Sequence, residues 1–323
     1  MEQVEDFLRD VKKQLDRFLV ELSKKYSEPS NLYKPAWEFV LSGGKRLRPA
    51  IVFLASQTAG NDKNAIIPAS AVELLHNFTL IHDDIMDRSD FRRKIPTVYK
   101  KYGLNQAILS GDVLMILAFE ILKELPLQLR PLVFDKLAEA SRIVCEGQQY
   151  DMDTDWKRVT LDTYLNIVSK KTASLLRYSA EIGVISTNPE DHLLRETLGN
   201  AMFYAGIAFQ IIDDYIDLFS DQSGKTRGLD IKEKKPSAII VAINSLDERH
   251  KIIAWESIEK FLKGIISVDQ LIQAFTDLKV EQIVKTMAHN YITKAEQILD
   301  NIREKENLNL WYDLINMLVD RKM

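Results

Sequence analysis

Two groups of acidic residues have the types and spacing that metal chemistry requires. Each group follows the pattern Asp-Asp-x-x-Asp and ends an apolar run, the first over 75–87 and the second over 209–217. In a helix, residues four apart lie on the same face, and successive residues differ by about 100°. Each group therefore presents its carboxylates over one arc of a helix. The carboxylates belong to Asp83, Asp84, Asp87, Asp213, Asp214 and Asp217.

The two groups predict a cation site if they face one another in the fold. Carboxylates gathered in one cavity repel strongly unless cations lie between them. Oxygen ligands favour Mg²⁺ or Ca²⁺ over Zn²⁺, and Mg²⁺ keeps coordination positions for water or substrate phosphates. We therefore expect a metal-bridged phosphate or diphosphate substrate. The alternative is a pair of solvated acidic helix faces.

A glycine-rich basic segment, Gly43–Pro49, supplies positive charge. Lys45, Arg46 and Arg48 follow two glycines just before an expected helix. Glycines let the backbone approach an anion closely, and a helix N-terminus adds partial positive charge. Lys and Arg side chains would then complete a diphosphate site. The alternative is a solvated basic turn.

Other polar residues are weaker signals by themselves. Arg92 and Arg93 form a second cationic pair after the first acidic group, and surface charge is the alternative. His76 lies on the apolar helix before that group, where it is either a satisfied core residue or a phosphate contact. Surface positions are the ordinary explanation for the remaining polar motifs, Gly147-Gln148-Gln149-Tyr150-Asp151, Lys170-Lys171-Thr172, Lys225, Asp230 and Lys235.

The elements that must position these residues are predicted to be helices. Apolar residues recur at spacings of three and four over residues 2–26, which is typical of an amphipathic helix. Further helices are expected up to Leu41, after Pro49 to near Gly60, from about Ala65, and over residues 105–124, 130–153, 161–185, 190–221, 235–245, 247–262, 268–275, 279–301 and 306–320. No strand-turn-strand series, long repeat or dividing linker interrupts this pattern. We expect one all-α domain that spans residues 1–323.

Composition narrows the classes of function. The net charge of −4 and the pI of about 5.9 give no indication of a nucleic-acid partner. The single cysteine, Cys145, excludes an intrachain disulfide framework, fits a reducing compartment and is expected to be a small buried residue. The acidic N-terminus is unlike a signal peptide, and no window reaches about 18 uninterrupted apolar residues. We expect a soluble, cytoplasmic protein without a transmembrane segment.

In combination, the motifs resemble those of the trans-type isoprenyl diphosphate synthases, also called polyprenyl synthetases. Their order is Gly-Gly-Lys-x-x-Arg-Pro, Asp-Asp-x-x-Asp, Arg-Arg, Gly-Asp at Gly111-Asp112, Gly-Gln-x-x-Asp, Lys-Thr, Phe-Gln-x-x-Asp-Asp-x-x-Asp and Gly224-Lys225. The resemblance spans roughly residues 40–240 and is specific in the joint order of the motifs. It is strongest to archaeal-type geranylgeranyl and farnesyl diphosphate synthases. It implies a single helical bundle around a deep central cavity, and a homodimer.

The resemblance also implies a reaction and a set of roles. An allylic diphosphate ionises, isopentenyl diphosphate attacks the allylic cation, and a proton leaves. The aspartates named above are implied to hold Mg²⁺, expected as three ions, on the allylic diphosphate. Contacts to the allylic diphosphate are implied for Arg92, Lys171, Lys225 and Lys235, and contacts to isopentenyl diphosphate for Gly44, Lys45, Arg48, His76 and Arg93. Phe209 is implied to contact substrate, while the cation is stabilised by the backbone carbonyls of Lys171 and Thr172 and by Gln210.

Product length is expected to depend on residues just before the first acidic group. Phe78 lies five residues before Asp83, about 7.5 Å along a helix axis in the direction of product growth, and Thr79 beside it is small. Family members with an aromatic residue here resemble geranylgeranyl or farnesyl diphosphate synthases. We expect the C20 product, with the C15 product and an ordinary core role for Phe78 as alternatives.

Some positions depart from the family pattern. Lys94 and Lys234 stand where glycine is common, and Ser237 stands where threonine is usual. These departures question the loop geometry near Arg93 and Lys235 more than the chemistry. The C-terminal Asp320-Arg321-Lys322-Met323 resembles the short basic tail of many members, with a frayed terminus as the alternative.

Other protein classes share part of the pattern. A class I terpene cyclase would carry an Asn-x-x-x-Ser-x-x-x-Glu metal motif and no isopentenyl site, and a head-to-head coupling enzyme lacks the glycine-rich loop. A ferritin-like di-iron bundle needs two Glu-x-x-His pairs, and only Glu73–His76 is present. An inactive subunit of a hetero-oligomeric synthase is a non-enzymatic alternative, although both acidic groups are intact.

Overall fold

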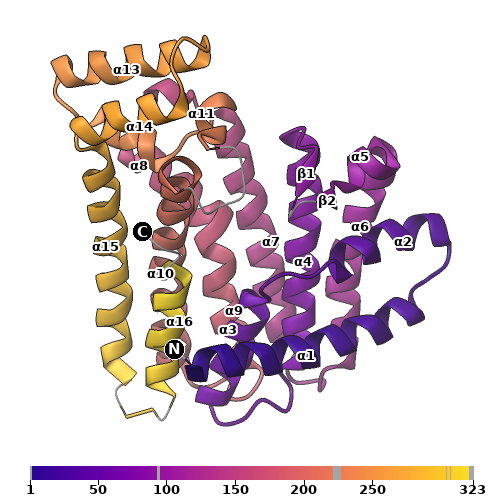
Figure 1. Cartoon of the computed structure of the whole chain (residues 1–323). Helices are drawn as coiled ribbons and strands as arrows, with labels where there is room; N and C mark the ends of the chain where they lie inside the picture. The colour runs from indigo at the N-terminus through magenta and orange to yellow at the C-terminus, as the bar shows by residue number, and fades with distance from the viewer. Residues whose placement is uncertain (1, 93–94, 221–226, 303, 306, 320–323) are drawn as a thin grey trace. The chain divides into compact units, whose positions relative to one another are not determined.

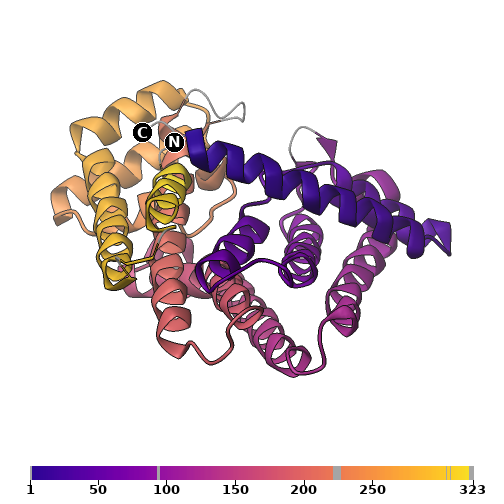
Figure 2. The ribbon, with the colours of Figure 1, turned by 90° about the horizontal axis from the view of Figure 1, so that it is seen from below.

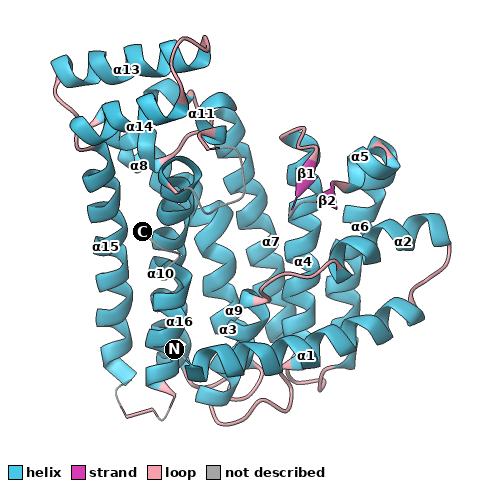
Figure 3. Ribbon diagram, in the orientation of Figure 1, coloured by secondary structure: helices cyan, strands magenta, loops and turns pink. Residues whose placement is uncertain are grey.

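The computed structural model describes residues 2–92, 95–220, 227–302, 304–305 and 307–319. Within these residues the chain is built of helices, and the only strands are two of two residues each (Figure 3). The predicted all-α class is therefore confirmed. The residues cluster into two compact units, each assembled from several separate segments of the chain.

Unit 1 comprises residues 1–141, 178–199 and 304–310. It holds the N-terminal helices and a small hairpin. In chain order these are α1 (Glu2–Lys25), α2 (Ser30–Leu41), α3 (Leu47–Thr58), α4 (Ile66–Met86), β1 (Phe91–Arg92), β2 (Ile95–Pro96), α5 (Val98–Tyr102), α6 (Leu104–Glu120), the 3-10 turn η1 (Ile121–Glu124), and parts of α7 (Arg130–Asp153), α9 (Ser174–Ile185) and α10 (His192–Phe219).

Unit 2 comprises residues 142–177, 200–303 and 311–323. It holds the remaining parts of α7, α9 and α10, and these three helices, like α16 with its first residues 308–310 in unit 1, contribute residues to both units. Its other elements are the 3-10 turn η2 (Trp156–Arg158), α8 (Leu161–Val168), the π-helical turn η3 (Ser169–Ala173), α11 (Leu229–Lys232), α12 (Ala238–Asn244), α13 (Glu248–Leu262), α14 (Val268–Asp277), α15 (Val280–Leu299), the 3-10 turn η5 (Asp300–Ile302) and α16 (Leu308–Val319).

Helix α1 follows the apolar rhythm of its sequence. Its residues Val4, Val11, Leu15, Leu19 and Leu22 are buried, and its polar positions face outward. The buried side packs across α3 and α4, as the two views in Figure 1 and Figure 2 show. Burial of one continuous apolar side is what stabilises such a helix in water.

Helix α4, which carries the first acidic group at its C-terminal end, packs most extensively against α6 (Figure 1). Most of α4 before its last turn is buried, including Leu74, Leu75 and Ile81. The apolar run therefore anchors the helix in the core of unit 1, whereas the carboxylates lie where that run ends. This arrangement positions charged groups at the end of a rigid element.

The predicted helix over 161–185 is interrupted by the π-helical turn η3. A side chain at Gly147 of α7 would place its Cβ 2.4 Å from the backbone nitrogen of Lys171. A side chain at Gly206 of α10 would place its Cβ 2.7 Å from Cα of Ala173. Two glycines thus let two helices of unit 2 approach η3 closely, and π-helical turns are frequent at functional sites.

Several elements differ from the sequence-based expectation. The hairpin β1–β2 and the short helices α5 and α11 were not predicted, because segments of two to five residues carry no hydrophobic period. Cys145 is exposed, not buried, because it lies on an outward position of α7 next to the buried Val144. The pKa of its thiol is raised by partial desolvation and by Glu146, which disfavours the reactive thiolate.

A membrane span requires a helix of about 20 residues with a predominantly apolar composition. By length and composition alone, residues Leu104–Glu124 meet that requirement, although 44% of the most apolar window is buried inside the fold. The core helix of a globular protein has the same composition, so this property alone does not indicate a membrane span.

Candidate active site

The first aspartate cluster comprises Asp83, Asp84 and Asp87 at the end of α4, and an arginine from β1 lies on it. Nε of Arg92 donates to Oδ1 of Asp84 at 2.6 Å, and its Nη2 is 3.6 Å from Oδ2 of Asp83. Asp84 is only 1% exposed. Burial raises the pKa of Asp84 to about 6, although Arg92 acts in the opposite direction. The cluster is therefore an acidic site that already attracts a cation.

The donor atoms of this cluster suit a hard divalent cation. Oδ2 of Asp84 is buried and accepts no hydrogen bond from the described residues. A buried carboxylate oxygen without a donor is costly, and a metal ion would remove that cost. Within the described part of the chain, no three His, Cys, Asp or Glu side chains converge closely enough to hold a metal by themselves.

The second aspartate cluster, Asp213, Asp214 and Asp217 on α10, behaves differently. Oδ2 of Asp214 accepts hydrogen bonds from the Tyr164 hydroxyl at 2.6 Å and from the backbone nitrogen of Ala238 at 2.8 Å. Its Oδ1 accepts from Nε2 of Gln210 at 2.9 Å. Both oxygens of Asp214 are thus engaged by the protein, and the residue is 4% exposed.

Asp214 consequently joins three elements of unit 2: α8 through Tyr164, α10, and the start of α12 through Ala238. Burial raises its pKa to about 7, whereas the three hydrogen bonds act to lower that value. The sequence predicts equal metal-ligand roles for all the aspartates. In the structure, protein donors hold both oxygens of Asp214, while its neighbour Asp213 is half-buried.

Gln210 connects Asp214 to the π-helical turn. The Thr172 hydroxyl donates to Oε1 of Gln210 at 2.9 Å. Because a carboxylate can only accept, the amide nitrogen of Gln210 must face Asp214 and its oxygen must face Thr172. Residues Thr172, Gln210, Asp214 and Tyr164 therefore form one hydrogen-bonded chain that fixes the orientation of the glutamine amide.

Other motif residues of unit 2 also form ion pairs and hydrogen bonds. Nζ of Lys171 donates to Oδ2 of Asp151 at 2.6 Å, which joins two motifs that are twenty residues apart in the sequence. The backbone nitrogen of Asp230 donates to Oδ2 of Asp217 at 3.1 Å. Lys235 pairs with Glu233 at 2.9 Å. Lys171, Lys235 and Asp217 belong to the predicted site, and the structure adds their respective partners Asp151, Glu233 and Asp230.

The glycine-rich segment 43–48 lies in unit 1 with the helix that carries His76. Gly43 and Gly44 have φ values of 105° and 140°, which glycine adopts without strain. Nη1 of Arg48 lies 3.2 Å from Nε2 of His76. Because arginine can only donate, Nε2 accepts, and the neutral imidazole carries its proton on Nδ1. The predicted pairing of a basic loop with His76 is present, and Lys45 is exposed.

Phe78 is buried on α4 and its ring meets His82 edge to face. The two ring centres are 4.7 Å apart at 66°. Nε2 of His82 donates to the carbonyl oxygen of Ile108 at 3.1 Å and is 3.6 Å from the carboxylate of Asp112. The hydroxyl of Thr79, the other residue predicted to limit product length, donates to the backbone carbonyl oxygen of His76. His82, which the sequence did not single out, thus connects Phe78 to α6.

Several predicted positions are not described by the structure. They are Arg93, Lys94, Gly224, Lys225 and the C-terminal residues 320–323. The sequence analysis missed Tyr164, and it named Arg46 and Asp151 without predicting the residues that they contact. A buried tyrosine hydroxyl needs a hydrogen-bond partner, but the sequence does not say which.

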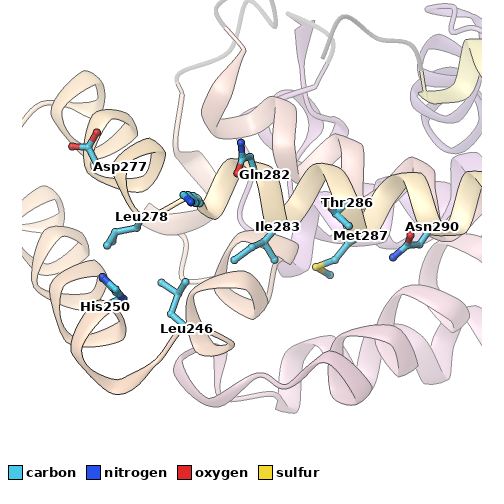
Figure 4. A pocket seen from close by; sticks show the side chains of 10 residues that line it. Leu246, His250, Asp277, Leu278, Gln282, Ile283, Thr286, Met287 and Asn290 are labelled. Carbon is cyan, nitrogen blue, oxygen red and sulfur yellow. The ribbon is translucent and has the colours of Figure 1, made fainter.

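A cavity of about 620 Å³ lies on unit 2 among α13, α14 and α15 (Figure 4). It is lined by apolar side chains such as Leu246, Ile283 and Met287, and by polar ones such as His250 and Gln282. None of its lining residues belongs to the sequence-predicted site. The groove along α15 is therefore a separate surface feature.

Comparison with known proteins agrees with the motif order. The family model "Polyprenyl synthetase" matches residues 29–275. A geranylgeranyl diphosphate synthase of Methanosarcina mazei is 36% identical over 306 residues, which is 92% of this chain and 91% of that protein.

Solved structures show the same fold. The crystal structure of geranylgeranyl pyrophosphate synthetase from Pyrococcus horikoshii covers 99% of this chain and 100% of its own, with 33% identity and a TM-score of 0.87. A polyprenyl synthase from Caulobacter crescentus, complexed with calcium and isoprenyl diphosphate, covers 98% of both chains, with 26% identity and a TM-score of 0.84. The chain belongs to the polyprenyl synthetase family. It is a prenyltransferase of the trans type, which rules out the ferritin-like alternative.

Proposed function

We propose that this prenyltransferase joins isopentenyl diphosphate head-to-tail to an allylic diphosphate, and that its product is geranylgeranyl diphosphate. Farnesyl diphosphate is the second candidate product. The observation that carries the proposal is the first aspartate cluster. There, one oxygen of Asp84 accepts a hydrogen bond from Arg92, and the other oxygen is buried without a donor. Such a cluster suits a cation that also contacts a diphosphate. The names of the relatives in Methanosarcina mazei and Pyrococcus horikoshii favour the C20 product.

The aspartates would hold Mg²⁺, as three ions, through Asp83, Asp84, Asp87, Asp213 and Asp217. When bound, Mg²⁺ supplies positive charge against the diphosphate leaving group. Asp214 would act mainly by fixing Gln210 and the start of α12, because its oxygens already accept three hydrogen bonds. Water or substrate oxygens must complete the coordination, since neither cluster provides a full ligand set by itself.

The cationic residues would divide between the two substrates. Lys45, Arg48 and His76, with the backbone near Gly44 and with Arg93, would hold isopentenyl diphosphate. Arg92, Lys171, Lys225 and Lys235 would contact the allylic diphosphate. Arg92 lies on Asp84 and Lys171 lies on Asp151, so both cations are held near acidic groups and can exchange a carboxylate for a diphosphate oxygen.

Residues of the π-helical turn would stabilise the allylic cation. Carbonyl oxygens of Lys171 and Thr172 carry partial negative charge, and so does Oε1 of Gln210. The hydrogen bonds to Thr172 and Asp214 fix this amide before the substrate arrives, which favours electrostatic stabilisation without reorganisation. Phe209 and the apolar helices would exclude water, which would otherwise quench the cation. The departing diphosphate would take the proton.

Phe78 would form the floor of the product cavity, with Thr79 beside it. The ring contact between Phe78 and His82, and the bond from His82 to the carbonyl of Ile108, support a floor that α4 and α6 share. On α6, the residues that contact His82 are Ile108 and Asp112. We propose that this rigid aromatic pair limits growth at the C20 product.

We also propose a homodimer, formed by an exposed apolar surface on α6 and on the connection before α7. This surface includes Leu109, Ile116 and Leu127, which are 52%, 57% and 75% exposed. Asp112 lies between Ile108 and Ile116 at spacings of four, so an acidic side chain interrupts the apolar face. A lipid environment disfavours such a charge, whereas a second copy of the chain can pair with it. A cytoplasmic location suits water-soluble diphosphate substrates and a free Cys145.

One incubation tests the proposal. The purified protein is supplied with Mg²⁺, labelled isopentenyl diphosphate and each allylic primer separately, and dephosphorylated products are separated by chromatography. We expect geranylgeraniol as the main product and no product in excess chelator. Cyclic hydrocarbons formed from an allylic diphosphate alone would indicate a terpene cyclase. No turnover with any primer would favour the inactive subunit of a hetero-oligomeric synthase.

A further inference from the structure

Arg46, in the middle of the basic loop, has an unusual position for an arginine. It is 3% exposed, although its neighbour Lys45 is exposed. Its backbone is left-handed, with φ 52° and ψ 37°, at the residue that precedes α3. Residues other than glycine adopt this conformation rarely and at a cost in free energy. The surrounding structure must therefore hold Arg46 in place.

The guanidinium group of Arg46 is fixed by three elements of unit 1. Nη1 donates to Oε1 of Glu73 on α4 at 2.6 Å, and Nε donates to Oδ1 of Asp16 on α1 at 3.0 Å. Nη2 donates to the carbonyl oxygen of Val40 on α2 at 2.7 Å. The planar fork of arginine suits such simultaneous contacts, which lysine cannot reproduce.

The Glu73 end of this contact is equally constrained. Glu73 is 3% exposed, and its Oε1 also accepts from Nδ2 of Asn77 at 3.0 Å. Glu73 lies one helical turn before His76 on α4, and His76 contacts Arg48. Arg46, just before α3, and Arg48, in the first turn of α3, thus contact α4 at successive turns. This fixes the loop in register along the helix.

The loop itself supplies little rigidity. Gly43 and Gly44 have no side chains to restrict their backbone, and both adopt positive φ values. A side chain at Gly43 would meet no atom within 4 Å. One further contact joins the loop to α1, where Nζ of Lys12 donates to the carbonyl oxygen of Gly44 at 3.0 Å. Without these contacts, the anion-binding side chains would have to be ordered when the substrate binds, which lowers affinity.

We propose that Arg46 and Glu73 are positioning residues for the isopentenyl diphosphate site. They contact no substrate, and their buried pair holds the segment 43–48 in register on α4 so that Lys45 and Arg48 are preorganised for a diphosphate. This inference rests on the proposed function of the loop. It gives a structural partner to Glu73, the glutamate of the Glu73–His76 pair. It also separates the role of Arg46 from the roles of Lys45 and Arg48, which would bind the anion.

The test compares Glu73→Gln and Arg46→Lys with a matched control. Glu181 on α9 is also 3% exposed and pairs with Nζ of Lys136 on α7 at 2.9 Å in the same unit. Glu181→Gln therefore makes the same chemical change in a similar environment. We expect Glu73→Gln and Arg46→Lys to raise the KM for isopentenyl diphosphate by about tenfold to a hundredfold, because small displacements have effects of this size. The KM for the allylic substrate should change by less than about threefold, and Glu181→Gln should change neither constant.

A double variant separates positioning from stability. Replacing both members of a buried ion pair by apolar residues often restores stability, so Arg46→Met with Glu73→Met should melt close to the wild type while its KM for isopentenyl diphosphate stays raised. A normal KM in the folded double variant, or an equal rise in Glu181→Gln, would overturn the inference. Calorimetric binding of inorganic diphosphate to each variant gives a second readout. If the wild type shows no condensation, the proposed function fails, whereas unchanged diphosphate affinity in Glu73→Gln refutes the positioning role alone.

Discussion

The imidazole of His82 occupies the space that a side chain at Gly111 would need. A Cβ added at Gly111 would come within 2.3 Å of Nε2 of His82. The same imidazole meets Phe78 edge to face. The glycine on α6 therefore permits the aromatic pair on α4, and this pair lies on the side of the aspartates toward which the product is proposed to grow.

We expect Phe78→Ala to make products at least one five-carbon unit longer, because it removes the proposed floor and leaves the diphosphate sites intact. Chromatography of dephosphorylated products measures the chain length. Gly111→Ala should shift the product distribution in a smaller degree, since it displaces His82 but keeps Phe78. Phe275→Ala, at a fully buried ring on α14, is the control for a loss of about 3–5 kcal/mol in stability. Unchanged product length in a folded Phe78→Ala variant would remove Phe78 from the mechanism.

Turnover should require a divalent cation and both aspartate clusters. We expect Asp83→Ala and Asp213→Ala each to lower kcat by orders of magnitude, because each removes a carboxylate that would neutralise charge on the leaving group through Mg²⁺. Diphosphate release, followed with and without excess chelator, measures this effect. Near-normal turnover in both variants, or full activity in chelator, would contradict the metal assignment.

Mg²⁺ should stabilise the protein more at pH 7.5 than at pH 5. The pKa of Asp84 is raised from 3.8 to about 6 in the folded protein, so its contribution to stability is fully present below pH 3.8 and is lost as the pH rises through about 6. Above that pH the fold holds an ionised buried carboxylate, which Mg²⁺ would compensate. Thermal melts with Mg²⁺ and with chelator measure the difference. In Asp84→Asn the increase in melting temperature caused by Mg²⁺ should no longer grow with pH. An equal increase at pH 5 and pH 7.5 in the wild type would contradict the role of Asp84 as the group that Mg²⁺ compensates.

The two diphosphate sites should separate in kinetics. Lys45→Ala and Arg48→Ala should raise the KM for isopentenyl diphosphate about tenfold to a hundredfold, from lost charge-assisted hydrogen bonds of about 1.5–3 kcal/mol each. The KM for the allylic diphosphate should change far less. Lys12→Ala, which removes the bond to the carbonyl of Gly44 and the pairing of Lys12 with Asp16 at 3.5 Å, should give a smaller effect on the same constant. Equal effects of Lys45→Ala on both substrates would refute the division.

Tyr164→Phe should weaken the link between α8 and Asp214. The loss of one donor to a buried carboxylate costs about 1–3 kcal/mol. Burial raises the pKa of Asp214 to about 7 even though this hydrogen bond acts to lower it, so the loss of the bond should raise that pKa further. The acidic limb of the kcat profile should then move to higher pH, as steady-state assays across pH 5–8 would show. Tyr215 lies on the same helix as Asp214, and its hydroxyl donates to Glu281 of α15 at 2.9 Å. Tyr215→Phe removes this hydroxyl and should leave the pH profile of kcat unchanged.

The sequence determined the helices and most of the chemistry by itself. Helix formation depends on a local apolar period, so the buried residues of α1 and the long helices could be predicted from spacing alone. Residue types at fixed intervals, such as Asp83, Asp84 and Asp87, likewise carry their chemistry in the sequence. The order of these motifs was enough to predict the family to which the chain belongs.

Only the tertiary structure decided which residues act together within each unit. Asp84 and Asp214 occupy the same place in the same motif, yet one lies under Arg92 and the other accepts from Tyr164 and Ala238. Arg46 looked like one more cation of the basic loop, and its burial against Glu73 separates it from Lys45. These differences arise from contacts between residues far apart in the chain. A local pattern cannot contain them, because the identity of a buried group's partner depends on how the helices pack.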